Sequence, residues 1–255
     1  MRTEVRLPPG HRLVHFAEID STNAEALRRA AVGERGPVWF WADRQSQGRG
    51  RLGRNWVSEA GNLYATLLIT RSVKPAVAGG LSIVVSLAVL NTLQAYLPPG
   101  PRLEVKWPND VLIEGSKAAG ILMESSLQAD LMIVAIGCGI NLASAPAATR
   151  YGATTLADHG AVVSPRAALE TLAEELDRLL QAWSAGAGFA GLKLAWLRHA
   201  RGLGRPIRVT AAGRTVTGCF EGLGENGSLF LRTPAGVREF HAGEVSLADV
   251  SESPQ

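Results

Sequence analysis

The sequence has few cysteines, few lysines and no long unbroken apolar run, and each shortage narrows the function classes open to it. Its two cysteines, Cys138 and Cys219, cannot form a disulfide framework, and neither has the neighbours of a metal-ligand motif. Cys138 lies inside the apolar run Leu131–Ile140, which predicts a small buried thiol. We therefore expect a protein of a reducing compartment, the cytoplasm.

Segments that would target or anchor the chain to a membrane are also missing. The N-terminal residues 1–20 contain no uninterrupted apolar stretch, so we expect no signal peptide. The most apolar segment, Ala76–Leu97, is interrupted by glycine, serine, asparagine and threonine, which argues against a transmembrane span. A buried core helix that ends before Pro98-Pro99 explains this segment better.

Lysine is scarce although the chain is slightly basic. Only four of the 26 basic residues are lysine, and the net charge of +3 is too small to argue for nucleic-acid binding by itself. Two of the four, Lys106 and Lys117, fall within one short stretch. Because the ammonium group differs from guanidinium in hydration and geometry, lysines kept in such a chain suggest a chemical role.

The order of the expected elements predicts an α+β fold. Hairpin patterns alternate with helices over most of the 255 residues, which disfavours a parallel βαβ array. From about residue 204 the pattern changes to short strands separated by glycine-containing turns, typical of a small β-barrel. We therefore expect a large domain over residues 1–202 and a small one over 203–255.

Several elements can be placed more closely. Thr22-Asn23-Ala24-Glu25 has the pattern of a capping box and predicts a helix that ends near Gly33. Leu131–Leu142 is apolar on both faces, as expected of a central strand. A turn at Gly115-Ser116 predicts a hairpin, and Ser164-Pro165 predicts the start of a long helix.

Residues 43–56 form a polar loop rich in glycine and arginine, which follows the expected strand Val38–Ala42. Gly48–Gly53 formally matches G-x-G-x-x-G, but no helical pattern follows, as a dinucleotide-binding site requires. No kinase or P-loop motif accompanies it. A loop presenting Arg49, Arg51 and Arg54 to anionic oxygens remains one interpretation. A solvated basic turn or a nucleic-acid patch remains the other.

Three further clusters allow both a structural and a functional interpretation. Lys106–Asp110 (Lys-Trp-Pro-Asn-Asp) lies at a strand end, where proline, asparagine and aspartate also form ordinary turns. Lys117 follows a hairpin turn and could be a solvated turn lysine. Gly137-Cys-Gly-Ile-Asn141 ends a buried strand, where the two glycines indicate either a bulge or a close approach to a ligand.

Together these motifs resemble those of the biotin–protein ligase family, from about His15 to Leu247. They occur in the family's order: Ser21-Thr22-Asn23, Gln45 with Gly48-Arg-Gly-Arg-x-Gly-Arg-x-Trp56, Lys106-Trp-Pro-Asn-Asp110, Lys117-x-x-Gly120-Ile-Leu-x-Glu124 and Gly137-x-Gly-Ile-Asn141. Any one of them is moderate evidence, whereas five in order are specific.

The resemblance implies a catalytic domain with the fold of class II aminoacyl-tRNA synthetases, a mixed sheet with flanking helices, followed by an SH3-like barrel. It also implies an enzyme that forms biotinyl-5′-AMP from biotin and ATP. The biotinyl group would then pass to one lysine of a biotin carboxyl carrier protein, a subunit of acetyl-CoA carboxylase or a related carboxylase. ATP would be accompanied by Mg²⁺.

The resemblance also assigns roles to individual residues. Biotin would be bound by Ser21, Thr22, Asn23, Gln45, Arg49, Gly50, Arg51 and Lys117. ATP or the adenylate would be bound by Arg54, Trp56, Lys106, Asn109 and Asn141. Lys117 and Arg51 would be the catalytic residues, Lys117 bridging the biotin carboxylate and the α-phosphate. Asp110 is a candidate Mg²⁺ ligand.

The pattern departs from the family at Leu52, where another basic residue is common, and at Ala248, where an arginine is common. The biotin motif begins at residue 21, so we expect no N-terminal helix-turn-helix domain and no sequence-specific DNA binding. A homodimer remains open. A lipoate–protein ligase, which shares the fold, is the nearest alternative. A nucleic-acid-binding module is the other, although Phe220, Phe230 and Phe240 are spaced as core residues.

Overall fold

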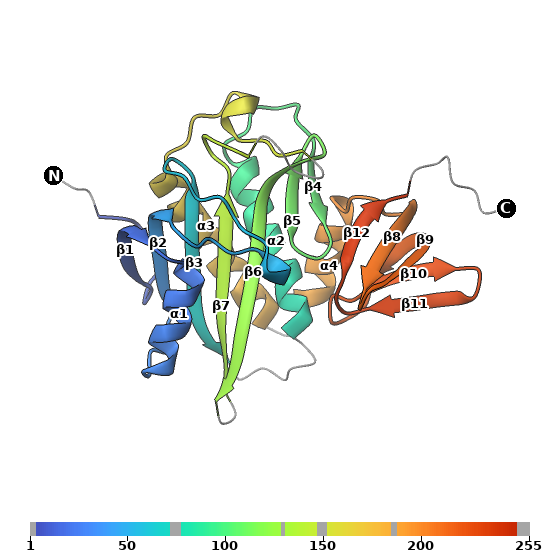
Figure 1. Ribbon diagram of the computed structural model, residues 1–255, viewed down its shortest axis with the longest axis horizontal. Helices are drawn as coiled ribbons and strands as arrows, with labels where there is room; N and C mark the ends of the chain where they lie inside the picture. Colours follow the sequence, from blue (N-terminus) through green and yellow to red (C-terminus); the bar gives the residue numbers. More distant parts are fainter. Residues whose placement is uncertain (1–3, 72–77, 129–130, 147–151, 185–187, 249–255) are drawn as a thin grey trace.

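The computed structural model describes residues 4–71, 78–128, 131–146, 152–184 and 188–248, which form two sheets and four α-helices (Figure 1). The strands of the large sheet are β1 (Arg12–Ile19), β2 (Val38–Gln45), β3 (Leu63–Arg71), β4 (Leu103–Lys106), β5 (Asp110–Ile113), β6 (Ser116–Gln128) and β7 (Leu131–Ile140). The helices are α1 (Thr22–Ala31), α2 (Ala78–Gln94), α3 (Pro165–Ser184) and α4 (Gly188–Arg198). The small sheet contains β8 (Pro206–Ala211), β9 (Arg214–Leu223), β10 (Leu229–Thr233), β11 (Gly236–Phe240) and β12 (Glu244–Leu247).

The large sheet is mixed, which confirms the expected α+β class. Its order is β1-β2-β3-β7-β6-β5-β4, with β1 parallel to β2 and every other neighbour antiparallel. The strand β7 is the fourth of seven and is buried along almost its whole length. The prediction that the apolar run from Leu131 is a central strand is therefore confirmed.

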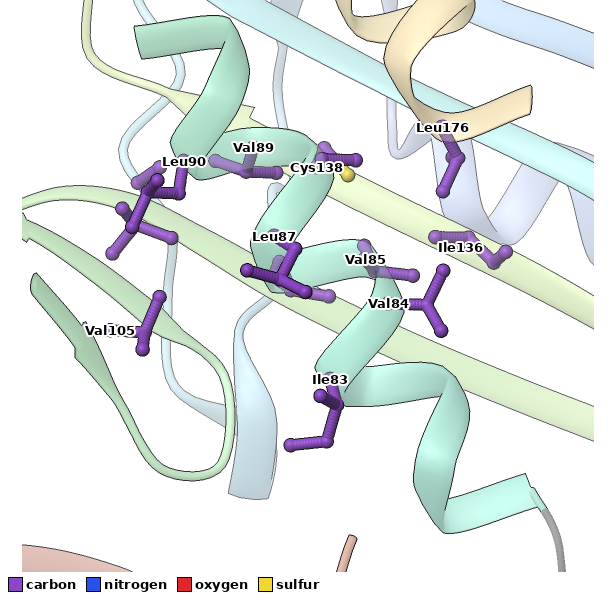
Figure 2. Close-up of a cluster of buried hydrophobic side chains, with 14 of the residues drawn as sticks. Ile83, Val84, Val85, Leu87, Val89, Leu90, Val105, Ile136, Cys138 and Leu176 are labelled. Atoms are coloured by element: carbon purple, nitrogen blue, oxygen red, sulfur yellow. The ribbon is translucent and has the colours of Figure 1, made fainter. Parts of the chain in front are cut away.

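The helix α2 forms the centre of the main core. It lies with α3 and α4 on one face of the sheet (Figure 1), and it contacts both helices. Figure 2 shows side chains of α2, including Val84 and Leu87, converging with Ile136 of β7 and Leu176 of α3. Because most of α2 is buried, its largely apolar sequence reflects burial in protein. Among the helices described, none is both long and apolar enough to cross a bilayer.

The helix α1 lies alone on the opposite face of the sheet. It contacts β2, β3 and β7, and Ala26 and Ala30 pack against Phe40, Leu68 and Ile133 in a second, smaller core. The small alanine side chains let the helix approach the sheet closely. As a result, the N-terminal end of α1 lies directly over the polar residues of the sheet described below.

The small sheet is antiparallel in the order β11-β10-β9-β8-β12, as expected of the C-terminal barrel. Phe220 and Phe240 are buried in it, which supports their interpretation as core residues. Residues 199–203 connect it to the large sheet: the backbone of residues 199–201 pairs with Val105 of β4, and Leu203 bridges to Phe220 of the small sheet. The apolar core is continuous across this junction.

Several element boundaries differ from those expected. The strand β2 continues through Gln45 into the segment expected to be a loop, because its end pairs with β1. The hairpin turn lies at Glu114-Gly115, one residue early, and both residues have positive φ. The helix α2 ends at Gln94, and residues 76 and 77 of the expected helix lie outside the described residues.

Candidate functional site

The N-terminal end of α1 presents three polar residues that are at least 96% buried. Ser21 caps the helix: its backbone is extended and its Oγ accepts a hydrogen bond from the Ala24 amide at 3.4 Å. The expected capping box on Thr22 is therefore wrong by one residue. Glu25 instead pairs with Arg28 and Arg29, while Arg28 holds the pKa of the neighbouring Asp20 at about 2.

Thr22 does not cap the helix, and its side chain takes part in a polar network beneath it. Its amide and its hydroxyl both donate to Gln45 Oε1, at 2.8 and 3.1 Å, and Gln45 Nε2 donates to Ser58 at 3.0 Å. Thr66 Oγ1 of β3 lies 2.8 Å from Thr22 Oγ1 and 2.6 Å from Asn23 Oδ1. Thr66 is completely buried and was not expected in the site. Its signal in the sequence is a single threonine inside the otherwise apolar Leu63–Ile69.

Asn23 connects this network to β6 and to the arginine-rich loop. Its Nδ2 donates to the Leu122 carbonyl at 3.2 Å and to Glu124 Oε2 at 2.9 Å. The same carboxylate oxygen of Glu124 lies 3.3 Å from Arg49 Nη2. Glu124 belongs to one of the motifs but was not assigned a role, and the structure makes it the link between Asn23 and Arg49.

Glycines in β6 and β7 make room for the side chains that line the site. A Cβ on Gly137 would lie 2.2 Å from Asn23 Oδ1, and one on Gly139 would lie 2.7 Å from the Trp56 ring. Gly120, which pairs with Gly139 across the two strands, is equally close to that ring. The alternative of a bulge at Gly137 and Gly139 is wrong, because β7 pairs with both neighbours in regular register there.

Trp56 itself lies flat against this glycine-lined surface. Its Nε1 is buried and has no hydrogen-bond partner among the described residues. Lys117 Nζ lies 5.2 Å from the centre of its ring, within the range of a cation–π interaction. A buried indole N–H without a partner is costly, so the site offers a donor to a ligand at this point.

Lys117 is not a solvated turn lysine. Its Nζ lies 2.6 Å from Asp110 Oδ1, and Lys106 Nζ lies 4.0 Å from the other oxygen of the same carboxylate. The Lys117 backbone is held by Asn141, whose Nδ2 lies 3.3 Å from the Lys117 carbonyl and 3.2 Å from that of Thr154. Two lysines therefore flank one carboxylate, and an anionic ligand would find a compact pair of cations here.

The arginine-rich loop runs from β2 across the front of the large sheet as far as β6 (Figure 1), and its arginine side chains reach the small sheet. Arg51 Nη1 donates to Asn109 Oδ1 at 3.1 Å, and its guanidinium also donates to the Gly243 carbonyl at 3.3 Å. Arg54 forms an ion pair with Glu244 at the start of β12. Burial lowers the pKa of Arg51 because desolvation disfavours the charged guanidinium, and an anionic ligand beside it would oppose this effect.

Two adjoining cavities contain every residue that the sequence assigned to the site. The first and smaller cavity is lined by Ser21, Thr22, Asn23, Gln45, Arg49, Gly50, Arg51, Trp56, Asn109 and Lys117, together with glycines of β6 and β7. The second and larger cavity is lined by Arg54, Lys106, Asp110 and Asn141 and shares Gly50, Arg51, Trp56, Asn109 and Lys117 with the first. Residues from Ser21 to Asn141 thus come together where the two cavities adjoin.

The side chains around Asp110 do not fit a dedicated metal site. Among the described residues, no three histidine, cysteine, aspartate or glutamate side chains gather so that they could hold a metal ion. The Asp110 carboxylate already has two ammonium groups within 4.0 Å. A divalent cation could reach it only after Lys117 moves away.

Comparisons with known proteins agree with this geometry. The chain matches the model of the biotin/lipoate A/B protein ligase family over residues 18–141 and that of the biotin protein ligase C-terminal domain over residues 202–248. It is 43% identical to a biotin–[acetyl-CoA-carboxylase] ligase of Paracoccus denitrificans, covering 90% of this chain and 98% of that protein.

Two further matches come from bacteria of other groups. The bifunctional ligase/repressor BirA of Escherichia coli (strain K12) is 30% identical, over 90% of this chain and 72% of that protein. The structure of the biotin protein ligase from Aquifex aeolicus in complex with biotin and ATP is 30% identical, with a TM-score of 0.78, and covers 93% of this chain and 98% of that one. The chain described here belongs to the biotin–protein ligase family.

Proposed function

We propose that this chain activates biotin with ATP to form biotinyl-5′-AMP and then transfers the biotinyl group to a lysine of a biotin carboxyl carrier protein. The observation that carries the proposal is the junction of the two cavities. A pocket that has one wall of neutral polar side chains meets a chamber lined by Arg54, Lys106 and Lys117, as a reaction between a carboxylate and a nucleotide requires. The names of the related ligases support biotin and a carboxylase subunit as the substrates.

The smaller cavity suits the ureido ring of biotin. This ring has two N–H donors and one carbonyl acceptor, so it needs neutral groups of both kinds. Asn23 and Gln45 offer amides, and Ser21 and Thr22 offer hydroxyls, on one buried wall. Tyr64 lies behind them with its hydroxyl donating to the Glu59 carbonyl, and burial raises the pKa of Tyr64 to about 12, so this wall stays uncharged.

The larger cavity suits ATP. In the first step an oxygen of the biotin carboxylate attacks the α-phosphorus, a P–O bond forms, and the bond to the β-phosphate breaks as pyrophosphate leaves. Two anionic groups must meet, so a cation between them lowers the barrier. Lys117 fulfils this role by leaving Asp110 for the reacting oxygens, while Lys106 neutralises the carboxylate that remains. Trp56, Asn109 and Asn141 shape the nucleotide side.

The second step uses the same junction. The carrier's lysine nitrogen attacks the acyl carbon, the amide bond forms, the bond from that carbon to the phosphate oxygen breaks, and AMP leaves with the electron pair. The loop 48–56 covers the mixed anhydride and excludes water, because hydrolysis would waste it. Arg51 and Arg54 then exchange their protein partners for anionic oxygens of the intermediate.

We propose that Mg²⁺ enters with the triphosphate of ATP, as is usual when a site lacks several carboxylates. Asp110 stays a candidate ligand only for a state in which Lys117 has turned to the substrate. The two cysteines are free thiols, which supports the cytoplasm as the compartment.

The test of this function is pyrophosphate exchange into ATP, measured separately with biotin, lipoate and octanoate. We expect exchange with biotin alone. Exchange driven by lipoate and not by biotin would replace the proposal with the lipoate–protein ligase alternative. The C-terminal family match, which is specific to biotin protein ligases, favours the first outcome.

A further inference from the structure

The 152–159 segment pairs with the start of β6 at Lys117. The strand β7 ends at Ile140 before it reaches this point of β6, and the segment takes its place. The Lys117 amide donates to the Gly152 carbonyl at 3.1 Å, and the Thr154 amide donates to the Lys117 carbonyl at 3.0 Å. Both backbone groups of the proposed catalytic lysine are therefore bound by this segment.

The backbone of Lys117 directs its hydrogen-bonding capacity to the 152–159 segment and to Asn141. A backbone unit has one N–H donor and one carbonyl oxygen with two lone pairs. The donor is used by Gly152, and the two lone pairs are used by the Thr154 amide and by Asn141 Nδ2, the latter at 3.3 Å. Asn141 Nδ2 also donates to the Thr154 carbonyl at 3.2 Å, so that Asn141 and the segment hold each other. The position of the Lys117 Cα therefore depends on Thr154.

Thr154 is held in turn by the side chains of Asp158 and His159. It is buried, and its Oγ1 lies 3.2 Å from Asp158 Oδ2 and 3.0 Å from His159 Nε2. Because the hydroxyl has a single proton, which it donates to the carboxylate, the imidazole Nε2 is the donor in the other bond. The same carboxylate oxygen accepts the Thr155 amide at 2.9 Å. Hydrogen bonding by Thr155, its amide first, lowers the pKa of Asp158, so one ionised oxygen holds two successive residues of the segment.

We propose that Asp158 and His159 are positioning residues for Lys117 in the formation of biotinyl-5′-AMP. The inference rests on the proposed function, in which Lys117 leaves Asp110 to reach the reacting oxygens. The ammonium group then loses the carboxylate that fixed it, and the position of Nζ depends on the backbone that the segment holds. Asp158 and His159 line neither of the two cavities, and they act through Thr154.

The test compares the loss of each bond to Thr154 with its conservation. Asp158→Ala and His159→Ala remove the bonds, whereas Asp158→Asn keeps an acceptor oxygen and His159→Gln keeps an N–H donor. Asp158 is exposed and His159 is half-buried, so these changes leave the apolar core intact. Asp177→Ala is the matched control, because Asp177 also pairs with a histidine, His11, and lies outside the two cavities. Thermal unfolding of each variant checks that the fold is kept.

The rate of adenylate formation is measured by rapid quench in a single turnover at saturating biotin and ATP, and the biotin dissociation constant by equilibrium binding. In both alanine variants we expect the rate to fall by about tenfold, because a small misplacement of a group aimed at the reacting centre is costly. Asp158→Asn, His159→Gln and the control should keep nearly the full rate. The biotin dissociation constant should not change in any variant, since none of residues 152–159 lines the smaller cavity.

A double-mutant cycle with Lys117→Ala separates the positioning of this lysine from a general loosening of the site. Without the Lys117 ammonium group the segment has no cation to position, so adding Asp158→Ala should cause no further fall in the rate of adenylate formation. A purely structural effect of Asp158→Ala would lower the rate in both backgrounds.

Full rates in both alanine variants would overturn the inference, and so would an equal fall caused by Asp158→Ala with and without the Lys117 side chain. Failure of the proposed function is distinguishable, since it would appear as absent biotin-dependent pyrophosphate exchange in the unaltered chain.

Discussion

We propose that the side chain of Lys117 has a structural and a chemical role at once. It forms an ion pair with Asp110 at 2.6 Å and lies over the Trp56 ring, and it also lines both cavities of the candidate site. It is one of four lysines in a chain that otherwise uses arginine as its basic residue. Its position at the junction of the two cavities gives a physical reason for a lysine at this point of the chain.

Replacement of Lys117 by alanine should slow the formation of biotinyl-5′-AMP by about 10²–10³-fold, the typical cost of removing one donor aimed at developing charge. Lys117→Arg should restore little, because a planar guanidinium cannot occupy the place of a compact ammonium group. Rapid-quench measurement of the adenylate in a single turnover gives the rate.

Lys193→Ala serves as the control, since this lysine lies on α4 and outside the cavities. Near-full activity of Lys117→Ala would leave the residue only its structural role as the counter-ion of Asp110.

At the scale of elements, the contacts of the arginine-rich loop go furthest beyond what its sequence indicates. Its three glycines and the absence of an apolar anchor between Asp43 and Leu52 predict a mobile segment in the free protein. In the structure Arg49, Arg51 and Arg54 each have a protein partner: Glu124, the Gly243 carbonyl and Glu244. These partners are acceptors that an anionic ligand can replace. The mobility of the free loop stays a prediction.

Arg51→Gly should still form biotinyl-5′-AMP but release it. A charge-assisted hydrogen bond contributes roughly 1.5–3 kcal/mol, so the off-rate of the intermediate should rise by about one to two decades. Released intermediate would label bystander proteins. The off-rate is measured by trapping, and loop closure by protease cleavage near Arg49–Arg51 with and without biotin plus ATP.

Arg44→Gly is the matched control, because Arg44 pairs with Glu59 on the exposed end of β2. An unchanged off-rate for Arg51→Gly, with equal cleavage in both ligand states, would remove loop closure from the mechanism.

At the scale of the whole molecule, the small sheet contributes to the candidate site. Glu244 and Val245 line the larger cavity. The indole of Trp107 donates to the Gly227 carbonyl at 3.0 Å, in a buried bond between the Lys106–Asp110 motif and the small sheet. We propose, as the sequence suggests, that residues 1–202 and 203–255 are two domains, but these contacts make them one functional unit.

Trp107→Phe should lower the free energy of unfolding by about 1–3 kcal/mol, because the Gly227 carbonyl is left buried without its donor. Urea unfolding followed by fluorescence and by circular dichroism measures the loss, and the two signals should change together in one transition.

Trp41→Phe is the matched control. The Trp41 Nε1 is buried and has no hydrogen-bond partner among the described residues, so this change removes no bond. If the two substitutions lowered the free energy of unfolding equally, the Trp107 hydrogen bond would contribute nothing to the association of the two sheets.

Much of this protein could be predicted from its sequence. The central strand, the core helix α2 and the change to short strands near residue 204 follow from local patterns, because a strand covered on both faces must be apolar throughout. The residues assigned to the two cavities follow from motifs that resemble those of a known family, since each motif is a short run of residues that can be recognised without the fold.

Other features were decided only in the tertiary structure. The edge strands β1 and β12 were not expected, because their mixed and half-exposed sequences become strands through pairing with β2 and β8. The contacts of Thr66, Glu124 and Glu244 in the candidate site likewise depend on partners that are distant in the sequence. The sequence assigned no role to any of them, and the contacts of each appear only when the fold brings a distant partner within hydrogen-bond distance. Residue types thus defined the chemistry, and packing decided which atoms meet.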